Sequence, residues 1–150
     1  MPIIKNQEIA ENTWSFIADD APLSDGDITV SSNRWNSEKT LLLQHCGKVG
    51  VRLQPGDSLN NISDDLSKID LVELTFPAFT DGRLFSAARL LRDKFNYRGE
   101  IRAVGHYLAD QVYYLHRVGV DTFEFENPQD LQVALNAIND FSVRYQNSSH

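Results

Sequence analysis

The feature that most constrains the fold is a strand–turn–helix pattern that repeats along residues 48–145. Each apolar, β-prone run in this region is followed by a turn and then by a stripe of apolar residues at helical spacing. The runs are residues 49–53, 71–76, 101–104 and 122–125. Strands that alternate with helices at this spacing indicate right-handed βαβ crossovers and a parallel sheet.

The strands alternate between apolar and charged residues, which restricts the fold further. A parallel sheet with helices on both faces has continuously apolar strands, whereas here Val51 and Leu53 flank Arg52. The polar positions are Arg52, Glu73, Thr75, Glu124 and Glu126, with Arg102 as a further candidate. We therefore predict an α/β fold with a four-stranded parallel (βα)4 sheet, shaped like a half-barrel and with helices on one face.

The charged face needs cover, because uncompensated burial of charge is expensive. Three arrangements would satisfy it: Arg–Glu pairing across strands, cover by the N-terminal hairpin, or enclosure by a second subunit. The sequence leaves all three open.

We predict a single domain over residues 1–150, in which residues 1–47 form an N-terminal β-hairpin and helix and residues 48–145 form the repeat unit. The hairpin would pair residues 3–4 with residues 14–17, which are apolar and β-prone. Residues 28–30 would form a short strand, and Ser31 or Ser32 would cap a helix that continues to about Cys46.

Composition excludes several classes of protein. The net charge of −7 argues against general nucleic-acid binding. The single cysteine and the spacing of the four histidines predict no metal site and indicate no particular cofactor. No apolar run approaches the roughly 18 residues of a membrane span, and no signal-peptide pattern is found, so we expect a cytoplasmic protein.

Charge is distributed unevenly along the chain. Residues 1–47 hold three Lys/Arg and seven Asp/Glu, whereas residues 83–102 hold six Lys/Arg and two Asp/Glu. The basic residues of the predicted helix and its continuation are Arg83, Arg89, Arg92, Lys94 and Arg98. Such a helix could dock an anionic ligand or an acidic partner, or it could simply present a solvated face.

Ligands of parallel α/β folds gather at the carboxyl ends of the strands. The turn after the second strand concentrates polar groups there: Thr80, Asp81, Gly82 and Arg83. Helix N-termini offer free amide donors, and an arginine can bind an oxyanion through two donors, so we predict a small oxyanion as ligand. The alternative is a capped helix with a solvent-facing arginine.

His106 and Asp110 are the candidate catalytic residues. His106 directly follows the third strand, and Asp110 lies one helical turn further on, where it could orient the imidazole. Gln111, Arg52 and Glu73 are candidate ligand-binding residues beside them. The alternatives are a structural histidine and a plain Arg–Glu pair.

Several segments together resemble a known bacterial family. They are residues 50–53, 76–83, 86–92, 97–105, 110–111 and 119–124, with Arg34 and Trp35 as the N-terminal part. The chain resembles a family of unknown function labelled as a probable oxidoreductase of sulfite reduction, whose members are typically encoded beside assimilatory sulfite reductase. The resemblance implies a place in sulfur assimilation, with sulfite reductase or its electron donor as partner.

Three functional hypotheses follow. The first is an accessory protein or probable oxidoreductase that acts with sulfite reductase; because the chain lacks thiol pairs and a dinucleotide loop, a redox role would need a borrowed flavin or a partner that handles the electrons. The second is a half-barrel enzyme that binds an oxyanion at the strand ends. The third is a structural homodimer whose polar faces meet.

Overall fold

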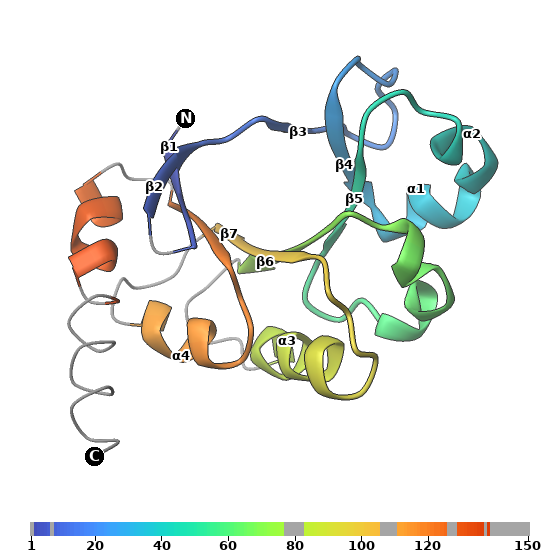
Figure 1. Ribbon diagram of the computed structural model, residues 1–150. Helices are drawn as coiled ribbons and strands as arrows, with labels where there is room; N and C mark the ends of the chain where they lie inside the picture. The colour runs from blue at the N-terminus through green and yellow to red at the C-terminus, as the bar shows by residue number, and fades with distance from the viewer. Residues whose placement is uncertain are drawn as a thin grey trace.

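The computed structural model describes residues 2–6, 8–76, 83–105, 111–125, 129–136 and 138. They form an eight-stranded sheet that curls into a half-barrel, with the helices on its outer side (Figure 1). The strands are β1 (Pro2–Lys5), β2 (Glu8–Glu11), β3 (Trp14–Phe16), β4 (Asp27–Ser31), β5 (Val49–Leu53), β6 (Leu71–Phe76), β7 (Glu100–Gly105) and β8 (Thr122–Phe125). The strand order is β2-β1-β8-β7-β6-β5-β4-β3.

The helices that follow these strands are short. They are α1 (Ser32–Ser37), α2 (Lys39–Leu43), the 3₁₀ helices η1 (Leu59–Asn61) and η2 (Ser63–Lys68), α3 (Arg83–Asp93), α4 (Val112–Arg117) and the helical residues 129–136. None of the described helices has the length and apolar character needed to cross a membrane.

The mixed α/β half-barrel is confirmed, but the prediction of four parallel strands is wrong. All strands from β3 to β8 run parallel, and β1 is antiparallel to both β2 and β8. One extra parallel strand arises because β4, α1, α2 and β5 form one more βα crossover ahead of the predicted repeat, and the other is β3, which pairs with the outer edge of β4. Ser31 starts this crossover, since its hydroxyl accepts a hydrogen bond from the Arg34 amide at 3.1 Å.

The predicted hairpin is also wrong in its partner strand. Residues 2–5 pair with residues 8–11, and Lys5 lies opposite Glu8. Asn6 makes this tight turn possible with φ of 53°, a left-handed conformation that asparagine tolerates better than most residues. Residues 14–16 instead pair with β4 at the opposite edge of the sheet.

Two predicted helices are broken. The helix expected to run to Cys46 is interrupted at Glu38, whose φ of −121° separates α1 from α2. The stripe of apolar residues from Leu59 to Ile69 folds into η1 and η2, and the Ser58 hydroxyl caps η1 by accepting a hydrogen bond from the Asn60 amide. Hydrophobic spacing therefore located these segments correctly but did not define their type or continuity.

The alternation of apolar and charged residues in the strands is confirmed. Val49, Val51, Leu53, Val72, Leu74, Phe123 and Phe125 belong to one buried hydrophobic cluster, together with helix residues such as Ala88, Leu91, Val112 and Leu115. Arg52, Glu73 and Arg102 lie on the other face, inside the curl. The main hydrophobic core is thus the layer between sheet and helices.

Arg92 fixes α3 to the loops below it. Its guanidinium donates to the carbonyl oxygens of Tyr97, Gly99 and Gly119 and to Asp121 Oδ2, at 2.7–3.1 Å. Gly119 adopts a φ of 109°, and a Cβ there would collide with the Arg92 side chain. Arg92 is therefore a structural residue, which corrects its assignment to the exposed basic face of the helix.

Replacement of Arg92 by lysine should destabilise the protein by about 2–3 kcal/mol, because an ammonium group cannot reproduce the guanidinium fork and partly buried carbonyls lose their donors. Urea unfolding monitored by circular dichroism measures this. Arg89→Lys is the matched control on the same helix, since Arg89 is exposed. Equal stability of the two variants would contradict the assignment.

Candidate functional site

The polar interior of the half-barrel is built by strand register. Arg52 lies opposite Glu73, Glu73 opposite Arg102, and Arg102 opposite Thr122 on four successive parallel strands. Because side chains alternate along a strand, residues paired in this way point to the same face. The register therefore gathers residues from four distant segments into one row.

Glu73 stands between two arginines at the centre of this row. Its Oε1 accepts from Arg52 Nε at 3.0 Å, and its Oε2 lies 3.9 Å from Arg102 Nη1. The side chains of Glu73 and Arg102 are 3% and 1% exposed, so both charges are buried. Paired charge of this kind is stable only when each member keeps its partner.

Glu100 continues the network toward the amino end of the strands. Its Oε2 accepts from Arg102 Nη2 at 3.0 Å and from Thr122 Oγ1 at 2.8 Å, and its Oε1 lies 3.3 Å from Lys5 Nζ. Burial alone would raise the pKa of Glu100, but the Thr122 hydrogen bond and the charges of Arg102 and Lys5 outweigh it and lower the pKa.

The N-terminal segment covers this interior. Asn12 accepts from Arg102 Nη1 at 2.7 Å through its Oδ1 and donates from Nδ2 to Glu124 Oε1 at 2.8 Å. The Phe16 ring lies against Arg52, with the guanidinium carbon 4.0 Å from the ring centroid. Asn12 lies between β2 and β3, and Phe16 lies in β3. The N-terminal segment of the same chain therefore covers the charged face of the sheet.

Of the three arrangements considered for the charged face, cross-strand pairing and cover by the N-terminal segment both occur. The charges of this network balance: the cations are Arg52, Arg102 and the exposed Lys5, and the anions are Glu73, Glu100 and Glu124. Burial of these charges therefore requires no second subunit. The homodimer stays a prediction that this observation does not support.

A few interior polar atoms keep unused bonding capacity. Thr29 Oγ1, Thr75 Oγ1 and Arg102 Nε are buried and form no hydrogen bond within the described part of the chain. Buried polar groups are normally bonded to protein or water. These atoms are the places where the interior can still bind water.

The structure brings together only part of the predicted site. Arg52 and Glu73 contact each other directly, and Gln111 lies at the start of α4. The other predicted site residues lie outside the described residues: Thr80, Asp81, Gly82, His106 and Asp110. Arg83 begins α3, but its side chain is not among those that the structure describes. Their proposed roles in oxyanion binding and acid–base catalysis stay predictions.

Sequence reasoning missed Asn12, Glu100 and Thr122. The signal for Glu100 was present, because it lies two residues before Arg102 and so shares its face of the strand. Thr122 stands in the same relation to Glu124. Asn12 carried no usable signal, since its role depends on where the N-terminal segment passes over the sheet.

The outer surface holds the accessible cations. Arg89, Lys94 and Arg98 are exposed, whereas Arg92 and Arg102 of the same basic region are bound within the chain. Among the residues that the structure describes, no group of three His, Cys, Asp or Glu side chains is arranged to hold a metal ion.

A comparison with known families finds a match for most of the chain. Residues 50–150 match a family model described as a bacterial protein of unknown function, DUF934. The match covers β5 to the C-terminus and so includes Arg52, Glu73 and Arg102. No curated protein matches the chain.

Asn12→Ala should destabilise the protein by about 2–3 kcal/mol, because it removes one hydrogen bond from the buried Arg102 and one from the partly buried Glu124. Chemical denaturation measures the loss. Asn33→Ala on the exposed surface of α1 is the control and should change stability by less than about 0.5 kcal/mol. A loss of the same size in both variants would show that Asn12 does not close the interior.

The lowered pKa of Glu100 makes a pH-dependent contribution to stability. A carboxylate with a depressed folded-state pKa stabilises the fold above its ordinary value of 4.5, and this contribution is lost as pH falls through the lower folded value. Thr122→Val should therefore cost about 1 kcal/mol at pH 7, and less near pH 3. Unfolding curves at both pH values, with exposed Thr40→Val as control, measure the difference. A pH-independent cost would contradict the assignment.

Proposed function

The chain belongs to this bacterial family of unknown function, and we propose that it is an accessory protein of assimilatory sulfite reduction that docks on sulfite reductase or on its electron donor. The pathway rests on the sequence resemblance described above. The docking mode rests on the charge distribution of the folded chain.

The observation that carries the docking mode is a set of exposed cations in one short region of an acidic protein. The net charge is −7, yet Arg89, Lys94 and Arg98 are each exposed, on α3 or on the residues that follow it. Complementary charge steers association and limits the choice of partner. An acidic partner would therefore be attracted to α3 and the residues that follow it.

The occupied interior supports docking over catalysis within the described residues. Arg52, Glu73 and Arg102 bind one another, and Asn12 and Phe16 lie over them. Functional groups already committed to one another are poorly placed to bind a substrate without breaking buried ion pairs. If the protein acts as an oxidoreductase, as the family label suggests, a bound cofactor or a partner protein would have to supply the electrons.

We expect the tagged protein to co-purify with sulfite reductase or its electron donor at low salt and to lose it at about 0.5 M salt, because screening weakens exposed charge pairs. The double variant Lys94→Glu/Arg98→Glu should lose most of the association. Lys48→Glu, an exposed cation before β5, should leave it largely unchanged. Quantitative pull-down followed by mass spectrometry measures all three.

Deletion of the gene provides the second readout. The deletion strain should grow with sulfide or cysteine as sole sulfur source and fail, or grow slowly, with sulfate or sulfite. Normal growth of the deletion strain on sulfite would overturn the proposal. So would an association with the reductase that neither high salt nor the charge-reversal variant weakens.

A further inference from the structure

A hollow of about 470 Å³ lies where the chain enters β6 and β7. One wall is the end of η2 with the residues before β6, and the other is the loop between α3 and β7. The polar residues Ser67, Asp70, Asn96 and Arg98 are among those that line it, with Phe95. This is the amino end of the parallel strands, opposite to the carboxyl ends at which we predicted an oxyanion from sequence.

Strand register and one tyrosine hold the two walls of this hollow together. Leu71 lies opposite Glu100 in the pairing of β6 with β7, so the residues just before these strands are neighbours. The Tyr97 hydroxyl donates to the Ile69 carbonyl oxygen at 2.9 Å and joins one wall to the other. Burial and then the charge of Asp70 raise the pKa of the Tyr97 phenol, so the hydroxyl keeps its proton for this bond.

The wall formed by residues 95–99 is fixed in shape. Asn96 adopts the left-handed conformation with a φ of 54°. Arg92 donates to the carbonyl oxygens of Tyr97 and Gly99 at 2.7 and 2.8 Å. A site whose walls are held in place before the ligand arrives loses less conformational entropy on binding.

The polar side chains around the hollow are available to a ligand. Ser67, Asn96 and Arg98 are exposed, and no hydrogen bond or ion pair joins their side chains to another described residue. Asp70 is also exposed, and its carboxylate accepts one long hydrogen bond, from the Val49 amide at 3.4 Å. The hollow therefore presents one cation and one anion that are not paired with each other.

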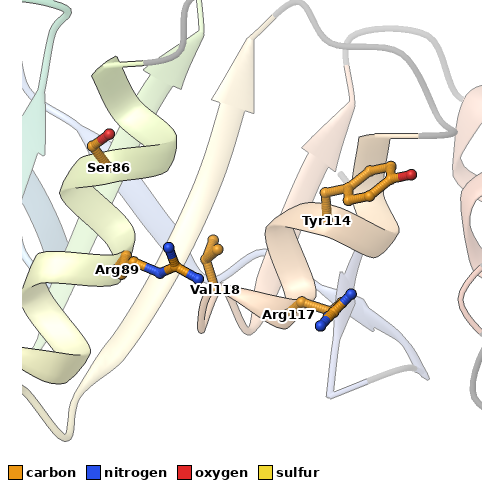
Figure 2. Close-up of a pocket in the computed structure, with 5 residues that line it drawn as sticks. All are labelled: Ser86, Arg89, Tyr114, Arg117 and Val118. Carbon is orange, nitrogen blue, oxygen red and sulfur yellow. The ribbon is translucent and has the colours of Figure 1, made fainter. Parts of the chain in front are cut away.

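The hollow between α3 and α4 offers less to a ligand, although Figure 2 shows four polar or charged side chains beside it. Ser86, Tyr114 and Arg117 already take part in interactions within the chain, which leaves Arg89. One exposed arginine does not define a binding site, because an isolated exposed charge contributes little.

We infer that the hollow at the amino ends of β6 and β7 binds a free α-amino acid with an apolar side chain. Asp70 accepts hydrogen bonds from the ammonium group, and Arg98 donates two to the carboxylate. The apolar side chain lies against the half-buried Phe95 ring. This inference goes beyond the proposed function and does not depend on it.

A ligand with both charges fits this arrangement better than an ion with one charge. An anion at Arg98 is repelled by Asp70, and a cation at Asp70 is repelled by Arg98. An ammonium and a carboxylate joined to one carbon atom pair with both residues at once. The Ser67 hydroxyl and the Asn96 amide supply further donors for the carboxylate. The volume falls within the range of roughly 300–1,000 Å³ typical of small-molecule sites.

The test uses L-leucine as the probe, titrated into the full chain at low salt and followed by amide chemical shifts in nuclear magnetic resonance. Shifts should concentrate on residues 66–71 and 95–100. N-acetyl-L-leucine lacks the ammonium charge and L-leucinamide lacks the carboxylate, so each should bind about tenfold more weakly. Glycine should also bind several-fold more weakly, because it has no side chain to contact Phe95.

Two variants test the assigned contacts. Asp70→Asn and Arg98→Gln should each weaken leucine binding by about tenfold, because each removes one charged partner of the ligand. Asparagine at position 70 keeps an acceptor for the Val49 amide, so the fold is retained. The controls Asp93→Asn and Lys48→Gln remove the same charges at exposed positions away from the hollow and should change affinity by less than twofold.

Three results would overturn the inference: no shifts in these two segments at millimolar leucine, binding of glycine or of either blocked analogue as tight as that of leucine, or unchanged affinity in both Asp70→Asn and Arg98→Gln. Asp70→Asn also separates this inference from the proposed function, because it should lose leucine binding and keep its association with the reductase. If leucine binds but no reductase co-purifies, only the proposed function falls.

Discussion

The buried carboxylate of Glu73, held between Arg52 and Arg102, is the interaction on which the rest of the half-barrel depends. A charge this deeply buried is stable only while both arginines remain in place. The arginines come from the strands on either side, so the parallel register of β5, β6 and β7 must be kept to within one residue. A slip of one residue would turn these charges into the hydrophobic layer.

Closure of the half-barrel follows from the short connection between its two edge strands. β2 and β3 are the two edges of the sheet, yet Glu11 and Trp14 are only three residues apart in sequence. A chain advances about 3.8 Å per residue, so these two ends lie within about 11 Å of each other. The sheet must therefore curl, and the connecting Asn12 is drawn over Arg102 and Glu124. The interior becomes occupied by the chain itself, whereas Arg89, Lys94 and Arg98 remain exposed on the outer side.

The strand pattern carried most of the fold information. The alternation around Arg52, Glu73 and Arg102 was sufficient to predict a parallel sheet with one charged face and a half-barrel shape. The hairpin partner and the role of Arg92 were not predictable in the same way. Residues 14–17 have the β-propensity of a hairpin strand, but propensity does not choose between edges of a sheet. From sequence alone, Arg92 is expected to be exposed like other basic residues on a helix. Only the folded structure shows that carbonyls of the following loops surround it.

The sequence by itself determined which residues face the helices and which face the interior, because side-chain direction in a strand has a strict period of two. It also placed the basic residues on one short region of an acidic chain. Only the tertiary structure decided which of these cations are already bound within the chain. Loop carbonyls bind Arg92, and Asn12 and Glu100 bind Arg102, whereas Arg89 is exposed. The physical reason is that these partners come from distant segments, and their positions depend on how the whole sheet curls.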